Sequence, residues 1–245
     1  AFEQGDKGGI YVVNFDGGSA GSLSVIGNYV DNMRFTYSGS WSPDTPMYWK
    51  DQTTKADFYC YYPYSASVTN VSAYPFAVKA DQSSETDYKA SDFLWGKTAG
   101  IAPTADPVQI TVQHAMSNLL ISLKAGSGYK DEDIKSATIK ICGMKTDATI
   151  DLATGKATAT GESIDITPKA ETGYYRALVV PQSIVDAELI KVSIGEYEYV
   201  LKQTVTFEAN KQHTCTLTVN RIGEGFNIGI GDWETDENDY GGTVE

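Results

Sequence analysis

Apolar and polar side chains alternate with a period of two along most of this sequence, and this rhythm is the feature that most restricts the fold. Residues 108–112, 119–123 and 215–219 each place an apolar side chain at every second position. Successive side chains of a β-strand point to opposite faces, so such a run buries one face and exposes the other. The pattern predicts an all-β fold.

Turn-forming residues separate these runs. Ala153, Thr154 and Gly155 predict a hairpin turn, and Gly195 with Glu196 predicts a two-residue hairpin loop. Strands joined in this way at short, fairly regular spacing are typical of stacked β-sandwich layers.

Helical signals are confined to residues 114–120 and 182–188, each of which is long enough for a single turn. Neither segment is expected to organise the fold. The fold class predicted from the pattern is therefore a β-sandwich without a helical layer.

The length of 245 residues suits two sandwiches, since a small β-sandwich has about 100 residues. Breaker residues gather just before the strong alternation restarts at position 108, namely Gly100, Pro103 and Pro107. We therefore predict an N-terminal β-sandwich domain in residues 1–105, a C-terminal β-sandwich domain in residues 106–233 and an acidic tail in residues 234–245.

The net charge excludes one large class of partners. Lys and Arg number 19 against 32 Asp and Glu, which gives a formal charge of −13. Such a surface repels phosphate backbones, so no nucleic acid is expected as a partner. No apolar run reaches the roughly 18 residues that a membrane-spanning helix needs. Ala1 and Phe2 are followed directly by polar residues and glycines, as expected if an export signal has been removed.

The three cysteines are predicted to be free thiols. They are too few and too scattered for a disulfide framework or a zinc site. Cys60 and Cys215 fall on apolar faces of their predicted strands, whereas Cys142 shares a face with Lys140. A bridge between Cys142 and Cys215 would therefore have to join faces of opposite character.

A search for catalytic, cofactor-binding or metal-binding residues identifies none. His114 and His213 have no nucleophile or further ligands beside them in the sequence. Gly96, Lys97 and Thr98 resemble the end of a phosphate loop, but Ser91 stands where that motif needs glycine. The acidic tail lacks the glycine and glutamate spacing of a calcium loop, although divalent-cation binding by it stays open.

Several aromatic residues allow two interpretations. Trp41, Trp49 and Tyr59 have rings that stack on sugars in glycan-binding proteins, and such rings also fill sandwich cores. Both interpretations stay open from the sequence.

Several motifs, taken in their order along the chain, resemble those of a known protein family. Trp49 is followed by a predicted strand from Ala56 to Pro63, and residues 108–119 combine an alternating strand with His-Ala and with a Ser-x-Leu motif that begins the next strand. Residues 177–182 end in Pro-Gln, and residues 228–233 end in Trp233. In this order and spacing, from Trp41 to Trp233, the chain resembles the fimbrillin superfamily of Bacteroidetes, the FimA-like and Mfa-like pilins.

The resemblance implies two transthyretin-like, Greek-key β-sandwich domains, a lipid-anchored precursor exported to the outer membrane surface, and assembly into extracellular fimbriae. Partners would be other fimbrial subunits joined by β-strand exchange, together with a host or bacterial surface ligand. Phe226, Ile228 and Ile230 form the candidate donor segment, and the same residues also suit a last core strand.

The first arginine is Arg34, inside a predicted strand, so an early arginine does not mark the processing site that the family implies. This departure favours a tip, anchor or accessory subunit. The alternatives are a surface glycan-binding lipoprotein and, as a third reading, a secreted enzyme with a β-sandwich domain; we do not expect an enzyme.

Overall fold

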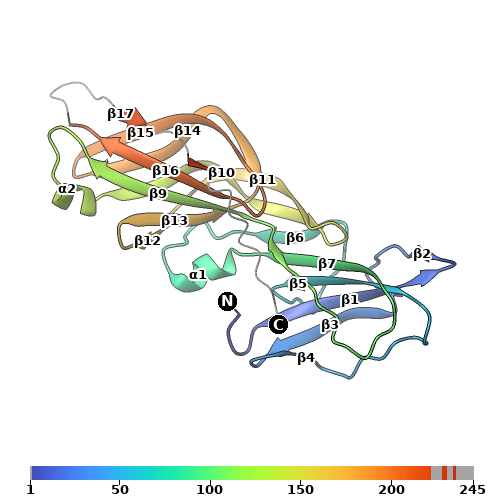
Figure 1. Cartoon of the computed structure of the whole chain (residues 1–245). Helices are drawn as coiled ribbons and strands as arrows, with labels where there is room; N and C mark the ends of the chain where they lie inside the picture. Colours follow the sequence, from blue (N-terminus) through green and yellow to red (C-terminus); the bar gives the residue numbers. More distant parts are fainter. Residues whose placement is uncertain (1, 222–227, 231–233, 236–245) are drawn as a thin grey trace.

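The computed structural model of this chain describes residues 2–221, 228–230 and 234–235. Almost every regular element in them is a β-strand. Figure 1 shows one sheet at one end of the molecule, two further sheets packed together at the other end, and helix α1 (Glu85–Ala90) between them. The prediction of an all-β fold with β-sandwich layers is confirmed.

The first sheet contains the N-terminal strands in the spatial order β4-β3-β1-β5-β7-β8, with β2 beside β1. All of its pairings are antiparallel. The strands are β1 (Lys7–Asp16), β2 (Ser19–Ala20), β3 (Val30–Tyr37), β4 (Trp41–Pro43), β5 (Ala56–Tyr62), β7 (Leu94–Ile101) and β8 (Gln113–His114). We call it the N-terminal sheet.

The other two sheets face each other. The second sheet has the order β11-β10-β14-β15, with β6 also paired to β10. Its strands are β6 (Tyr74–Ala77), β10 (Thr138–Asp151), β11 (Lys156–Ile166), β14 (Gln182–Ile194) and β15 (Tyr197–Phe207). The third sheet has the order β12-β13-β9-β16-β17, with β18 also paired to β16. Its strands are β9 (Ser117–Ala125), β12 (Lys169–Glu171), β13 (Tyr174–Val179), β16 (Gln212–Val219), β17 (Ile228–Ile230) and β18 (Glu234–Thr235).

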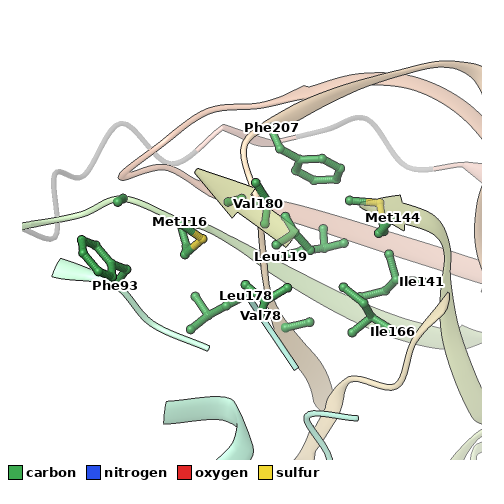
Figure 2. Close-up of a cluster of buried hydrophobic side chains, with 14 of the residues drawn as sticks. Val78, Phe93, Met116, Leu119, Ile141, Met144, Ile166, Leu178, Val180 and Phe207 are labelled. Carbon is green, nitrogen blue, oxygen red and sulfur yellow. The ribbon is translucent and has the colours of Figure 1, made fainter. Parts of the chain in front are cut away.

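The large core lies between the second and third sheets. Leu119 on β9 and Ile141 and Met144 on β10 have no exposed surface. Figure 2 shows these side chains directed toward one another, with Ile166 and Phe207 beside them. The alternation in the sequence thus buries one face of each sheet, which is how a sandwich is stabilised.

Both predicted hairpins are present. Asp151 pairs with Lys156 across the first turn, and Ile194 pairs with Tyr197 across the second. Gly155 has φ +74° and Gly195 has φ +58°, backbone conformations that glycine adopts without strain.

The prediction of short helical turns in residues 114–120 and 182–188 was wrong. Residues 117–120 belong to β9 and residues 182–188 to β14. The short helices are instead α1 and α2 (Asp131–Lys135), which local polar contacts start. The backbone N–H of Asp87 donates to Oγ of Ser84, the N-cap of α1, at 3.0 Å.

The side chain of Cys142 is buried, but it is not part of either cluster of core side chains. Cys142 is 6% exposed, although Lys140 two residues earlier is exposed. The register of β10 against β11 shifts between Ile141 and Met144, where Gly143 has φ +64°. The thiol of Cys142 lies near the charged side chains of Asp165 and Lys191, and Lys191 pairs with Lys140 on the neighbouring strand. All three cysteines are free, as predicted.

The division into residues 1–105 and 106–233 stays a prediction. Strand β6 lies in the first of these ranges but pairs with β10 in the second. Within the described residues, no helix is long and apolar enough to cross a membrane.

Candidate functional site

Strand β1 is apolar on both faces, which separates the N-terminal sheet from a simple sandwich layer. Tyr11 and Val13 belong to a cluster of buried side chains that is continuous with the large core, whereas Ile10 and Val12 point to the opposite, outer face. The outer face is covered by half-buried side chains from loops and strand ends, among them Met47, Trp49, Val108 and Ile110.

An apolar groove lies on this outer face, with a cavity volume of about 520 Å³. Ile10 and Val12 of β1 and Phe58 and Cys60 of β5 line it, and the loops around Trp49 and around residues 107–112 contribute the rest of its lining. Aromatic residues lie along it, namely Phe2, Trp41 and Tyr62 near Gly8 and Tyr29 and Tyr48 near Val12.

The dimensions of the groove suit an extended chain. The β1 residues that line it run from Gly8 to Asn14, which is about 20 Å of strand. Cys60 is half-buried on β5, and burial raises the pKa of its thiol to about 12. The thiol is therefore neutral at physiological pH and contributes an apolar, weakly reactive surface.

The sequence-predicted aromatic residues do not share one surface. Trp41 lines the groove and meets the ring of Phe2 edge-on at 4.8 Å. Trp49 also lines it, and its Nε1–H donates to the carbonyl oxygen of Thr104 at 2.9 Å. Tyr59 is 5% exposed and packs on the other face, with the Lys97 ammonium 4.7 Å from its ring. A sugar-binding role for these residues stays a prediction.

The candidate donor segment is partly outside the described residues, because Phe226 is not among them. The backbone of Ile228 and Ile230 forms β17, which pairs antiparallel with β16 opposite Val219 and Leu217. The donor role stays a prediction. In the tail, residues 234–235 form β18 beside His213 and Thr214, and residues 236–245 lie outside the described part.

The histidines sit in contrasting surroundings. His114 Nδ1 lies 2.8 Å from Oδ1 of Asp92, and this hydrogen bond raises the pKa of His114 although partial burial opposes it. His213 is 8% exposed, and burial lowers its pKa. In the described part of the chain, His, Cys, Asp and Glu do not gather in a group of three or more that could hold a metal ion.

The groove was not predicted from the sequence. A usable signal is present at residues 10–13, where Ile10, Tyr11, Val12 and Val13 form an unbroken apolar run. Such a run predicts a strand that is covered on both faces.

Comparison with solved structures defines the class of fold. A candidate cell adhesion protein from Bacteroides uniformis superimposes with a TM-score of 0.74, at 23% identity over 96% of this chain and 92% of its own. The tip fimbrial protein Mfa3 from Porphyromonas gingivalis gives a TM-score of 0.51 at 7% identity, over 94% of each chain.

Sequence comparison defines the family. A candidate fimbrium subunit of Bacteroides uniformis, Fim1C, is 24% identical over 95% of this chain and 78% of its own length. The profile of the fimbrillin-like family matches residues 1–233. This chain belongs to the fimbrillin-like family, which confirms the resemblance and the predicted function class, a subunit of cell-surface fimbriae.

Proposed function

We propose that this chain is a structural fimbrial subunit that takes an extended strand of a neighbouring subunit into the apolar groove of the N-terminal sheet. The observation that supports this most directly is the groove itself, whose floor is formed by Ile10, Val12, Phe58 and Cys60. Apolar surface of this kind is stabilised when a partner covers it.

An extended strand fits the groove better than a compact ligand does. The lining runs along β1 for about 20 Å, and a strand of six or seven residues has that length. A partner strand with apolar residues at every second position would direct three of them onto the floor. Backbone hydrogen bonds would add affinity, as in other cases of strand addition.

Residues 226–230 are the proposed donor to the next subunit. Phe226, Ile228 and Ile230 alternate with Asn227 and Gly229, which is the required pattern. The ladder between β17 and β16 has only three residue pairs, and so short a ladder favours exchange.

The remaining expectations belong to the same proposal. The chain would act through assembly and adhesion and not through catalysis, and its precursor would carry a lipid anchor. A host or bacterial surface ligand would bind the assembled fimbria.

A synthetic peptide of residues 224–232 tests strand acceptance by thermal unfolding. At a peptide concentration of 100 times Kd, the stabilisation is about 2.7 kcal/mol. For a chain of this size the expected rise in Tm is roughly 5–10 °C. A scrambled peptide of the same composition should give no shift.

Two variants locate the binding site. Cys60→Phe fills the groove and should abolish the shift, whereas Thr158→Phe adds the same ring at an exposed position of β11 and should keep it. The proposal would be contradicted if the peptide gave no shift with the unaltered protein, or if Cys60→Phe responded as fully as Thr158→Phe.

A further inference from the structure

A second cavity lies where the N-terminal sheet meets the third sheet, beside helix α1 (Figure 1). Its volume is about 880 Å³, and we call it the junction cleft. Asp6 and Tyr62 line it from the N-terminal sheet side, and Asn118 on β9 and Gln212 on β16 line it from the third sheet. Cavities of about 300–1,000 Å³ between two parts of a fold are common places for small-molecule sites.

The base of the junction cleft is apolar, and aromatic rings stand beside it. Val112, Met116 and Leu178 line the cleft and are buried. Tyr62 and Tyr88 also line it and are half-buried, so each ring is partly open to the cavity. Tyrosine rings combine an apolar face with a polar hydroxyl, and this combination suits a ligand whose own rings carry both C–H and O–H groups.

Hydrogen bonds hold the polar side chains of the cleft in place. The hydroxyl of Tyr88 donates to Oδ1 of Asn118 at 3.2 Å, and Nδ2 of Asn118 donates to Oε1 of Gln212 at 3.0 Å. Nδ1 of His114 lies 2.8 Å from Oδ1 of Asp92. Side chains that are already ordered lose little conformational entropy when a ligand binds.

The same side chains keep polar atoms that are open to the cavity. In the described part of the chain, Nε2 of Gln212 and Nε2 of His114 make no hydrogen bond, and both atoms are accessible to solvent. The amide nitrogen of Gln212 carries two N–H donors, and the second carboxylate oxygen of Asp92 is an acceptor. Donors and acceptors side by side match sugar hydroxyl groups, because each hydroxyl both donates and accepts.

The ionic groups around the cleft are paired with one another. Lys89 forms ion pairs with Glu3 and Glu85, and Arg176 forms ion pairs with Glu85 and Glu171. An ionic ligand would therefore compete with existing pairs for its counter-charge. The formal charge of −13 further disfavours an anion. An uncharged ligand meets neither obstacle.

We propose that the junction cleft binds a neutral oligosaccharide of about the size of a di- or trisaccharide. Its rings lie against Tyr62 and Tyr88, and its hydroxyl groups bond to Gln212, His114 and Asp92. The oligosaccharide is the surface ligand of the proposed function, so its binding rests on the adhesive part of that function and is independent of strand acceptance.

An array of neutral oligosaccharides tests the class of ligand. It contains lactose, chitobiose, maltotriose and related neutral cores, together with sialylated and sulfated counterparts of the same cores. The unaltered protein should bind neutral members. Binding to none of them, or only to the acidic counterparts, would overturn the inference. The Tm shift with the peptide of residues 224–232 tests strand acceptance separately, so the two failures are distinguishable.

Two variants on β16 test the site, with the tightest neutral member of the array as the probe in calorimetry. Gln212→Leu keeps the side-chain shape and removes the open amide, so binding should weaken about five- to tenfold. Thr218→Val removes a polar group on the same face of β16 outside the cleft and should stay within about twofold. Equal affinities of the two variants would contradict the assignment of Gln212.

NMR of the unaltered protein gives a test that does not depend on the folding of a variant. The oligosaccharide should shift the side-chain amide signals of Gln212 and the ring signals of His114. The side-chain amide of Gln203 on β15, which is outside the cleft, should not shift. A bound oligosaccharide that shifts neither Gln212 nor His114 would place the site elsewhere and overturn the inference.

Discussion

The second and third sheets cover each other. The N-terminal sheet has one face in the continuous buried cluster, whereas loops cover its outer face. Leu119 and Ile141 in the sandwich are 0% exposed, and Ile10 and Phe58 on the outer face are 9% and 8% exposed beside a cavity of about 520 Å³. The same alternation therefore yields a complete core at one end and an incomplete one at the other. An incomplete core can be finished by a second protein.

Truncation of a buried side chain should give the largest difference between the two regions. Leu119→Ala removes a side chain from a closed core, so we expect a loss of about 3 kcal/mol in the free energy of unfolding. Ile10→Ala should cost about 2 kcal/mol, the low end of the range for such truncations, because the removed atoms border existing open space and leave little new cavity. Urea denaturation measures both.

Addition of the peptide of residues 224–232 sharpens this comparison. It should increase the cost of Ile10→Ala and leave the cost of Leu119→Ala unchanged. Equal costs for the two variants without peptide would show that the outer face is packed as tightly as the sandwich.

The two histidines should give opposite pH dependences of intermediate size. The pKa of His114 is raised in the folded state, so its stabilisation is fully present below the unfolded value of about 6.5 and is lost as pH rises through the folded pKa. The pKa of His213 is lowered, so the stability linked to it is present above about 6.5 and is lost as pH falls through the folded pKa.

Urea denaturation at pH 5.5 and pH 8 checks these signs. His114→Gln should lose more stability at pH 5.5 than at pH 8. His213→Phe should gain more at pH 5.5, because it removes a buried imidazole whose ring packs edge-on against Phe207. A difference that is independent of pH for either variant would disprove its assignment.

The smallest effect is expected at the surface of the N-terminal sheet. Arg34 and Asp44 form an ion pair at 2.8 Å, and each side chain is 41% exposed. Arg34→Ala should lower the free energy of unfolding by less than about 1 kcal/mol, since solvent screens such pairs. A larger loss in 0.5 M NaCl would mean that the pair has a structural role in holding β4 to β3.

Much of the fold could be predicted from local patterns. The strands around Leu119 and Leu217 and the hairpins at Gly155 and Gly195 follow from alternation and turn chemistry. Helix α1 was missed because its six residues carry no apolar periodicity, and its start depends on the Ser84 cap.

The candidate site shows the same division. The sequence placed Trp41 and Trp49 among the functional candidates, and both line the groove, but it also placed Tyr59 with them. Tyr59 directly follows Phe58 on β5, so the two side chains must lie on opposite faces. The groove could not be read from the sequence, since it joins residues far apart along the chain.

The sequence by itself determined that this protein is built of strands, where most of them turn, and that it belongs with the fimbrillin-like chains. Only the tertiary structure decided which apolar faces meet and which are left beside open space. The physical reason is that alternation specifies that a face must be buried, whereas the partner that buries it depends on how distant strands pair. At Ile10 and Val12 that partner is not another sheet among the described residues.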